Sequence, residues 1–330
     1  MERFCVFGAG AIGSHLAARL AMAGKDVSVV ARGDQLGAII NNGITLRADG
    51  KAVNMKVRAS GNAVDLGRQD AVFVTVKAPA MPAAARSLAP LLSASTAVIF
   101  VVNGIPWWYL QSLKETHPGN IRLPKSVEMV AETIALERVI GSVILSPAQV
   151  IEPGVVVVQG AKSRLTIGEI RGLSTNRVSA IAEALQSGGL QTLVSQNIRE
   201  AVWDKLITNL MTGPMSLLSR ATYKDILRDP ACRKAAVSIV QEVAAVARAF
   251  GCNPNDDAEV RLALVDKLPH KPSILQDLLL SRAMEVESLI DVPLALARVA
   301  DVPVPTLELL GSLAIVSARS AGLYSHTEVK

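Results

Sequence analysis

The sequence predicts an α/β protein, with a Rossmann-type doubly wound sheet in its N-terminal part and an all-α domain in its C-terminal part. In the first half, short β-rich runs alternate with helical patterns, which is typical of a parallel sheet covered by helices. After about residue 195 the pattern changes to long helical periodicities. Because 330 residues exceed a typical single domain, we expect two domains, at residues 1–195 and 196–330.

Short apolar runs mark the candidate strands. The first group consists of buried, parallel strands at residues 4–7, 26–30, 71–76 and 96–102. A second group is expected to extend the same sheet, at residues 139–145, 154–158 and 164–168. Helical periodicity predicts helices in the second domain at residues 231–250 and 273–290 and after Pro305.

Composition excludes several classes of partner. Half of the residues are hydrophobic, yet the apolar runs are far shorter than the roughly 20 residues that span a bilayer, so no membrane partner is expected. The net charge of +5 is spread along the chain, which argues against nucleic acid. Cys5, Cys232 and Cys252 lie far apart and outside any CxxC pattern, so we expect neither disulfides nor a metal site, and a cytoplasmic location.

The opening residues carry a glycine-rich turn. The apolar run at residues 4–7 leads into Gly8, Ala9, Gly10, Ala11, Ile12 and Gly13 and then into a helical pattern. Gly8 permits the turn, Gly10 lets the backbone approach a pyrophosphate, and Gly13 lets the helix pack closely on the strand. Since the free N–H groups of a helix start attract an anion, residues 8–13 are predicted to bind a dinucleotide.

The residue after the second apolar run indicates which dinucleotide binds. That run, at residues 26–31, ends in Arg32. NAD-specific folds place an acidic residue here for the ribose 2′-hydroxyl, whereas an arginine suits a 2′-phosphate. The sequence therefore predicts NADP(H).

A polar pair stands near the start of the second domain. Lys205 and Asn209 are four residues apart in a helical pattern, so they share one helix face. A cationic donor one turn from an amide is suited to hold the oxygens of a keto acid and to protonate its carbonyl as hydride arrives. The alternative is a surface lysine beside an asparagine that caps or bends the helix, and spacing alone favours that alternative because such pairs are common.

The motifs of both halves together resemble the ketopantoate reductase family. The resemblance covers nearly the whole chain and rests on the Gly8 to Gly13 loop, Arg32, Val76-Lys77-Ala78, Asn103-Gly104, Glu152-Pro153-Gly154-Val155, Gly168-Glu169, Trp203-Asp204-Lys205 with Asn209, Ser273 with Leu275-Gln276-Asp277, and Arg282 with Glu285. It implies a Rossmann domain and a helical domain, with NADPH reducing a 2-keto acid in the cleft between them. The family's default substrate is 2-dehydropantoate, and its product is pantoate.

The resemblance also implies roles for single residues. Lys205 matches the general acid, and Asn209 matches the amide that holds the substrate. Asn103 matches the asparagine that bridges nicotinamide and substrate; its alternative is an ordinary turn residue before Gly104. Lys77 resembles a cofactor contact, with a solvated loop cation as its alternative.

Three further matches leave alternatives open. Ala148 aligns loosely with a backbone contact to the cofactor. Ser273 resembles a substrate contact, but Ser273 to Gln276 is also a capping box at a helix start. Glu285 matches an acidic residue near the lysine and the cofactor ribose; its alternative is a surface partner for Arg282. Facing Lys205, Glu285 would favour the ammonium, and burial would oppose it.

The chain departs from the family pattern in several places. Val102 stands where the family often has glutamine. Gly213 and Tyr223 fall near positions of substrate-binding asparagines, so two polar substrate contacts are expected to be missing. The run Trp107-Trp108-Tyr109 is either a pocket wall near the nicotinamide or a hydrophobic anchor for the following helix or a subunit contact, and we favour the anchor.

Three functions follow in order of preference. The first is NADPH-dependent reduction of 2-dehydropantoate to (R)-pantoate with Lys205 as proton donor. The second is reduction of a different 2-keto acid or ketone, which Gly213, Tyr223 and the aromatic run Trp107-Trp108-Tyr109 favour. The third is a non-catalytic NADP(H) sensor, against which Lys205 and Asn209 together argue. A small-molecule keto acid is the expected partner, and a homodimer is a candidate assembly.

Overall fold

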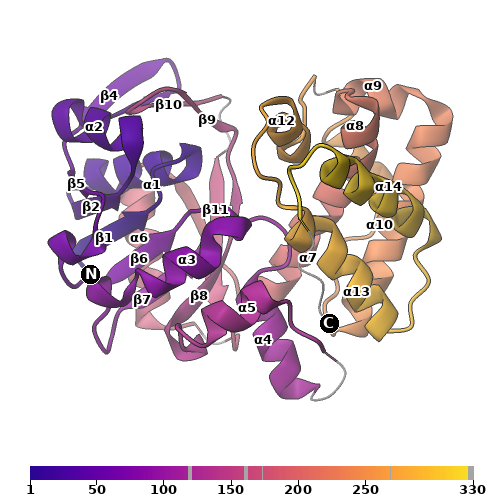
Figure 1. Ribbon diagram of the computed structural model, residues 1–330, viewed down its shortest axis with the longest axis horizontal. Helices are drawn as coiled ribbons and strands as arrows, with labels where there is room; N and C mark the ends of the chain where they lie inside the picture. Colours follow the sequence, from indigo (N-terminus) through magenta and orange to yellow (C-terminus); the bar gives the residue numbers. More distant parts are fainter. Residues whose placement is uncertain (118–120, 160–162, 173, 268, 326–330) are drawn as a thin grey trace. The chain divides into compact units, whose positions relative to one another are not determined.

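The computed structural model describes residues 1–117, 121–159, 163–172, 174–267 and 269–325 (Figure 1). The chain forms two compact units. The first unit comprises Met1–Val102 and Ser126–Ile198, and the second comprises Asn103–Lys125 and Arg199–Lys330. The first is a mixed α/β unit and the second is helical, so the predicted fold class is confirmed.

The first unit is built on an eight-stranded sheet in the order β12-β11-β8-β7-β6-β1-β2-β5. Neighbouring strands are parallel, except that β11 runs antiparallel to β8. The first four predicted strands are confirmed as β1, β2, β6 and β7. The strands are β1 (Arg3–Phe7), β2 (Asp26–Val30), β5 (Arg58–Ser60), β6 (Ala71–Val74), β7 (Ala97–Phe100), β8 (Val139–Leu145), β11 (Arg164–Glu169) and β12 (Gln191–Val194).

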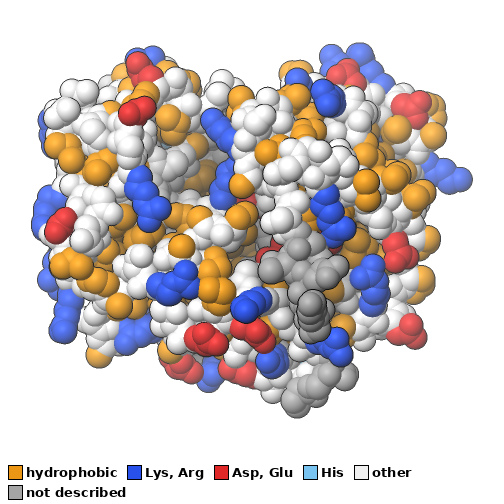
Figure 2. Space-filling view, in the orientation of Figure 1, with side chains coloured by type: hydrophobic (Ala, Val, Ile, Leu, Met, Phe, Trp, Pro, Cys, Tyr) orange, Lys and Arg blue, Asp and Glu red, His pale blue; other side chains and the backbone are white. Residues whose placement is uncertain are grey.

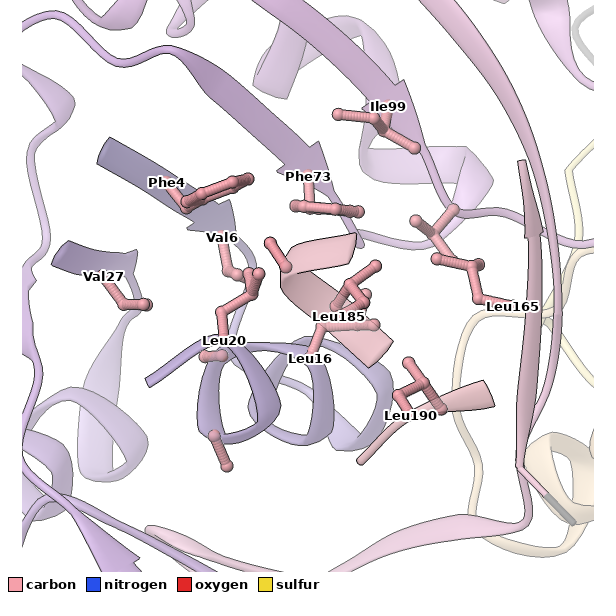
Figure 3. Packing of buried hydrophobic residues seen from close by; sticks show 14 of the residues in the cluster. Phe4, Val6, Leu16, Leu20, Val27, Phe73, Ile99, Leu165, Leu185 and Leu190 are labelled. Atoms are coloured by element: carbon pink, nitrogen blue, oxygen red, sulfur yellow. The ribbon is translucent and has the colours of Figure 1, made fainter. Parts of the chain in front are cut away.

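Helices α1 (Ala11–Met22) and α6 (Asn176–Ser187) pack against each other and supply the main core of this unit. Leu16 and Leu20, one turn apart on α1, and Leu185 of α6 face Phe4 and Phe73 of the sheet (Figure 3). Each side chain is fully buried, which stabilises the fold by about 1.5–3 kcal/mol per residue. The unit also contains α2 (Gly33–Asn42), α3 (Met81–Arg86) and α5 (Lys125–Ala131).

The first unit has a second, four-stranded sheet, in the order β4-β3-β10-β9. The expectation that residues 154–158 extend the large sheet is wrong, because β10 pairs with β3 and β9 instead. Gly154 (φ +79°) turns the chain back onto β9, and both edges of β8 are already paired, with β7 and β11. The strands are β3 (Ile44–Ala48), β4 (Lys51–Met55), β9 (Ala148–Glu152) and β10 (Val155–Val158).

The second unit is a group of helices around α10 (Pro230–Ala249). Asp229 caps this helix, since its side chain accepts hydrogen bonds from the N–H groups of Ala231 and Cys232, and the predicted helix 231–250 is confirmed to within one residue. Helix α14 packs against α8 and α10. The other helices are α4 (Trp107–Thr116), α7 (Ile198–Leu210), α8 (Gly213–Ser219), α9 (Tyr223–Arg228), α11 (Ala258–Ala263), α12 (Ser273–Leu279), α13 (Val292–Val299) and α14 (Pro305–Ser320).

The predicted single helix at residues 273–290 is wrong. Helix α12 ends at Leu279, and Ser281 then adopts a left-handed conformation with φ 51°. The N–H of Met284 donates to the carbonyl of Leu323, which holds the segment in a non-helical course. Helical structure resumes in a π-helical turn, η5 (Glu287–Asp291), that continues into α13. Arg282 and Glu285 consequently do not share a helix face.

The observed units differ from the predicted domains in one long segment, and their boundary lies three residues later, after Ile198. Residues 103–125, which the expected division at 195/196 leaves with the sheet, group with the helical unit. The reason lies in the aromatic run: Trp107, Trp108 and Tyr109 begin α4 and are buried. The indole N–H of Trp203 on α7 donates to the hydroxyl of Tyr109 at 2.7 Å, with the rings edge to face. These contacts support the anchor interpretation of the aromatic run.

Candidate active site

The glycine turn of the first unit has the geometry of an anion site. β1 ends at Phe7, and α1 begins at Ala11 with Gly10 as its N-cap. Gly8 has φ +110°, and a Cβ on Gly13 would lie 1.9 Å from the carbonyl oxygen of Gly8. A Cβ on Gly10 would meet nothing within 4 Å, so the approach to the helix N-terminus is open there. These residues fit a pyrophosphate held by the first N–H groups of α1.

Thr75 supports this turn, and sequence analysis missed it. Its hydroxyl donates to the carbonyl oxygen of Gly8 at 2.6 Å, and a Cβ on Gly13 would also lie 2.6 Å from that hydroxyl. Its position could have indicated this role, because Thr75 directly follows β6, at the carboxyl end of the strand next to β1. Thr75 therefore helps to fix the backbone of the turn.

The other predicted cofactor residues of the first unit lie on three different elements. Arg32 follows β2 and is the exposed N-cap residue of α2, and Lys77 follows β6 and is half-buried. Because β1, β2 and β6 are adjacent and parallel, the glycine turn, Arg32 and Lys77 follow the same sheet edge. Ala148 begins β9 in the smaller sheet, which packs against α1, and its role stays a prediction.

The second unit brings together three predicted residues that are far apart in sequence. The ammonium of Lys205 on α7 donates to the side-chain oxygen of Asn103 at 2.7 Å. The amide nitrogen of Asn103 donates to a carboxylate oxygen of Glu285 at 3.0 Å. Glu285 is buried, which excludes the surface pairing with Arg282. Asn103 thus links the lysine to the glutamate and is more than an ordinary turn residue.

A close backbone contact fixes the loop that carries Asn103 against the segment that carries Glu285. Gly104 has φ +76°, and a Cβ there would lie 2.3 Å from the carbonyl oxygen of Ser288. That carbonyl accepts a hydrogen bond from the N–H of Ile105 at 2.9 Å. The loop after β7 therefore lies directly on the π-helical turn that follows Glu285.

Hydrogen bonds to Asp204 anchor helix α7. The guanidinium of Arg261, itself buried, donates to the Asp204 carboxylate at 2.5 Å and to the Asp204 carbonyl at 2.9 Å. The N–H of Asn255 also donates to that carboxylate at 3.2 Å. These bonds fix the helix that carries Lys205 and Asn209.

The electrostatic surroundings suit Lys205 to donate a proton near neutral pH. Burial lowers the pKa of its ammonium to about 8, and the negative charge of Glu285 opposes this shift. Burial has the larger effect on this pKa, and the two influences oppose each other as the sequence predicts. A lysine with this pKa is charged at neutral pH and gives up its proton far more readily than an ordinary lysine.

Asn209 and Ser273 line one pocket. It is a small pocket that opens to solvent, and it is bordered by α7, α8, α12 and η5. The predicted capping box at Ser273 is wrong: Pro272 is the N-cap of α12, and the Gln276 amide donates to the Lys271 carbonyl at 2.8 Å. Gly213 also lines the pocket, whereas Tyr223 packs against His270, with ring centroids 5.7 Å apart and ring planes tilted by 45°.

Other kinds of site find no support in the described part of the chain. Among those residues, no group of three or more His, Cys, Asp and Glu side chains could hold a metal ion. No described helix is both long and apolar enough to cross a bilayer. On the face that Figure 2 shows, lysine and arginine side chains are scattered among other types.

Together, the fold and the site define a class: a pyridine-nucleotide oxidoreductase with a Rossmann-type unit and a helical unit. The family model described as ketopantoate reductase PanE/ApbA matches residues 4–172, and the model of its C-terminal part matches residues 197–317. The chain belongs to the ketopantoate reductase PanE/ApbA family, and the resemblance found in the sequence is confirmed.

Individual relatives agree with this assignment over nearly their whole lengths. A 2-dehydropantoate 2-reductase of Mesorhizobium japonicum is 36% identical over 98% of this chain and 100% of its own. The crystal structure of a putative ketopantoate reductase from Ralstonia solanacearum MolK2 is 33% identical, with a TM-score of 0.87 over 98% of this chain and 100% of that one. The 2-dehydropantoate 2-reductase structure from Methylococcus capsulatus is 27% identical, with a TM-score of 0.81 over 96% and 97%.

Proposed function

We propose that this protein reduces 2-dehydropantoate to (R)-pantoate with NADPH, and that Lys205 is the proton donor. The observation that carries the proposal is the hydrogen-bonded chain from Lys205 through Asn103 to Glu285, in the same unit as Asn209 and Ser273. The names of the relatives supply the substrate.

The cofactor part of the proposal rests mainly on the first unit. The N–H groups at Gly10 to Gly13 would hold the pyrophosphate, and the Arg32 guanidinium would pair with a 2′-phosphate. Lys77, Ala148, Asn103 and Glu285 are the remaining proposed cofactor contacts. When bound, NADPH supplies the hydride for the keto carbon.

The substrate part rests on the second unit. Asn209 and Ser273 would hold oxygens of the keto acid, and Asn103 keeps the Lys205 ammonium in a fixed direction. As the keto carbon gains the hydride, its oxygen takes a proton from Nζ of Lys205 and becomes the hydroxyl of the product. The neutral amine then regains a proton from solvent.

Two further points belong to the proposal. A cytoplasmic location fits the three dispersed cysteines, which are all free. A homodimer is the assembly we expect, and light scattering of the purified protein measures it.

The second candidate is a different 2-keto acid. The specific observation in its favour is the lining of the pocket beside Asn209, in which Gly213 and several apolar side chains take part.

The decisive experiment follows NADPH oxidation with 2-dehydropantoate for the wild type and for Lys205→Ala. Lys234, exposed on α10, provides the control variant Lys234→Ala. We expect turnover by the wild type and the control, and a loss on the order of 10²–10⁴-fold in kcat for Lys205→Ala. Tight NADPH binding without turnover of any 2-keto acid would instead identify a sensor.

A further inference from the structure

The pocket beside Asn209 is lined by two polar side chains and otherwise by residues without polar side chains. Its polar side chains are Asn209 and Ser273. The other lining residues carry no side-chain hydrogen-bond donor or acceptor: Leu210, Gly213, Pro214, Pro272, Ile274, Leu289 and Ile290. We call these seven residues the apolar wall, because a ligand group that reaches them meets no polar side chain.

Gly213 keeps part of this wall open. It is the first residue of α8 and is buried, and neither its backbone conformation nor its packing requires glycine. A Cβ there would meet only Cγ2 of Ile274, at 3.9 Å, which is ordinary contact. Since alanine stabilises a helix relative to glycine, the missing side chain does not serve the stability of α8. Its effect is to leave space next to Ile274.

The two polar side chains, together with Lys205, suffice for the head of a keto acid. A 2-keto acid presents two carboxylate oxygens and one carbonyl oxygen, and the proposed function assigns these to Asn209, Ser273 and Lys205. The side chain on the third carbon would then face the apolar wall. A terminal hydroxyl on that side chain would find no side-chain hydrogen-bond partner among the seven apolar lining residues, so its transfer from water is poorly compensated.

We propose that this pocket selects 2-keto acids with a branched hydrocarbon side chain and does not require a hydroxyl on it. The inference rests on the proposed function and narrows its substrate class. Gly213 is the residue that sets the room for the branch.

The first test compares two substrates that differ by one hydroxyl: 2-dehydropantoate and 3,3-dimethyl-2-oxobutanoate. An apolar pocket discriminates weakly against an added hydroxyl, by at most about 10²-fold, whereas a site built to bind that hydroxyl rejects the analogue that lacks it by about 10⁴-fold or more. We expect kcat/KM for 3,3-dimethyl-2-oxobutanoate to equal or exceed that for 2-dehydropantoate. A preference for 2-dehydropantoate of about 10³-fold or more would overturn the inference.

The second test fills the space with Gly213→Val. Both branched acids should lose at least about tenfold in kcat/KM, while pyruvate, which carries only a methyl group, should stay within about threefold. Gly37→Val is the matched control, because Gly37 lies in the exposed part of α2 and a Cβ there meets nothing within 4 Å. Equal losses for pyruvate and the branched acids would count against the role of Gly213.

A binding measurement separates this inference from the proposed function. With NADP⁺ in place of NADPH no reduction occurs, and calorimetry then gives Kd for each keto acid. The inference is supported, even if turnover fails, when the Kd values of the two branched acids lie within about tenfold of each other and Gly213→Val raises both. Binding of 2-dehydropantoate alone, or of neither branched acid, overturns it.

Discussion

At the scale of single residues, the site depends on how burial and charge act on one ammonium group. Lys205 loses solvation on burial, which lowers its pKa to about 8, and Glu285 restores part of the preference for the charged form. Asn103 lies between them, with its oxygen toward the lysine and its nitrogen toward the glutamate. The Asn103 amide therefore orients the Lys205 ammonium relative to the Glu285 carboxylate and adds no charge of its own.

This balance predicts how the reduction rate depends on pH. Because only the ammonium donates a proton, kcat/KM should be level below the pKa of Lys205, near 8, and fall about tenfold per pH unit above it. Glu285→Gln removes the charge that raises this pKa, so the falling limb should move to lower pH. Glu259→Gln, at an exposed position on α11, is the control. An unshifted limb in Glu285→Gln would show that the two groups are not coupled.

Arg32 predicts the cofactor preference. If its guanidinium pairs with the 2′-phosphate, Arg32→Ala should raise KM for NADPH by about 10–100-fold, which matches the loss of one charged hydrogen bond of about 1.5–3 kcal/mol. KM for NADH should change by less than about threefold, because NADH lacks that phosphate. Arg86→Ala, at the exposed end of α3, should change neither value. Equal losses with both cofactors would argue against the NADP(H) assignment.

At the scale of elements, the site depends on a loop and a broken helix. Asn103 lies in the loop after β7, and Glu285 lies in the non-helical stretch between α12 and η5. Had residues 273–290 formed one continuous helix, Glu285 would have occupied a helix face and not the end of a stretch beside the Asn103 loop. The close approach of Gly104 to the Ser288 carbonyl joins the two segments.

Gly104→Ala tests the contact between these two segments. The added Cβ would lie 2.3 Å from a backbone oxygen, so the loop or the π-helical turn must shift. We expect kcat/KM to fall by about 10²-fold, because displacement of a catalytic group by about 1 Å has that effect. Gly251→Ala is the matched control: Gly251 is also left-handed, at φ +75°, but its Cβ would meet nothing within 4 Å. Similar activity in both variants would show that the contact is not required.

At the scale of the whole molecule, the chain crosses between units more often than the sequence indicates. Residues 103–125 leave the sheet unit, contribute α4 to the helical unit, and the chain then returns to the sheet for α5 and β8. As a result, Asn103 belongs to the same unit as Lys205 and Glu285. All three tryptophans of the chain, Trp107, Trp108 and Trp203, also lie in this unit.

Tryptophan fluorescence can therefore follow the helical unit alone. Tyr109→Phe leaves the buried indole N–H of Trp203 without its acceptor, so we expect the free energy of unfolding detected by fluorescence to fall by about 1–3 kcal/mol in urea. The Kd for NADPH should stay within about twofold, because most of the proposed cofactor contacts belong to the other unit and the protein remains folded in the absence of urea. Tyr223→Phe is the control, since the Tyr223 hydroxyl makes no hydrogen bond within the described ranges. An unchanged fluorescence transition in Tyr109→Phe would contradict the anchoring role of α4.

Local patterns made much of the fold predictable. The alternation of apolar runs and helices located β1, β2, β6 and β7, and the capped periodicity located α10. The pattern failed where pairing depends on distant strands, as for β10, whose apolar run is equally compatible with either sheet. It also failed at Ser281, because apolar periodicity continues through the break while the backbone conformation does not.

The sequence by itself determined the glycine turn, the position of Arg32 after β2, and the shared helix face of Lys205 and Asn209. Each of these depends on residues within a few positions of one another, whose conformations local sterics and periodicity set. The tertiary structure alone decided that Asn103 bridges Lys205 and Glu285, across 102 and 182 residues of sequence, and that Gly213 opens an apolar pocket wall. Such contacts arise from the packing of distant elements, which no local pattern encodes.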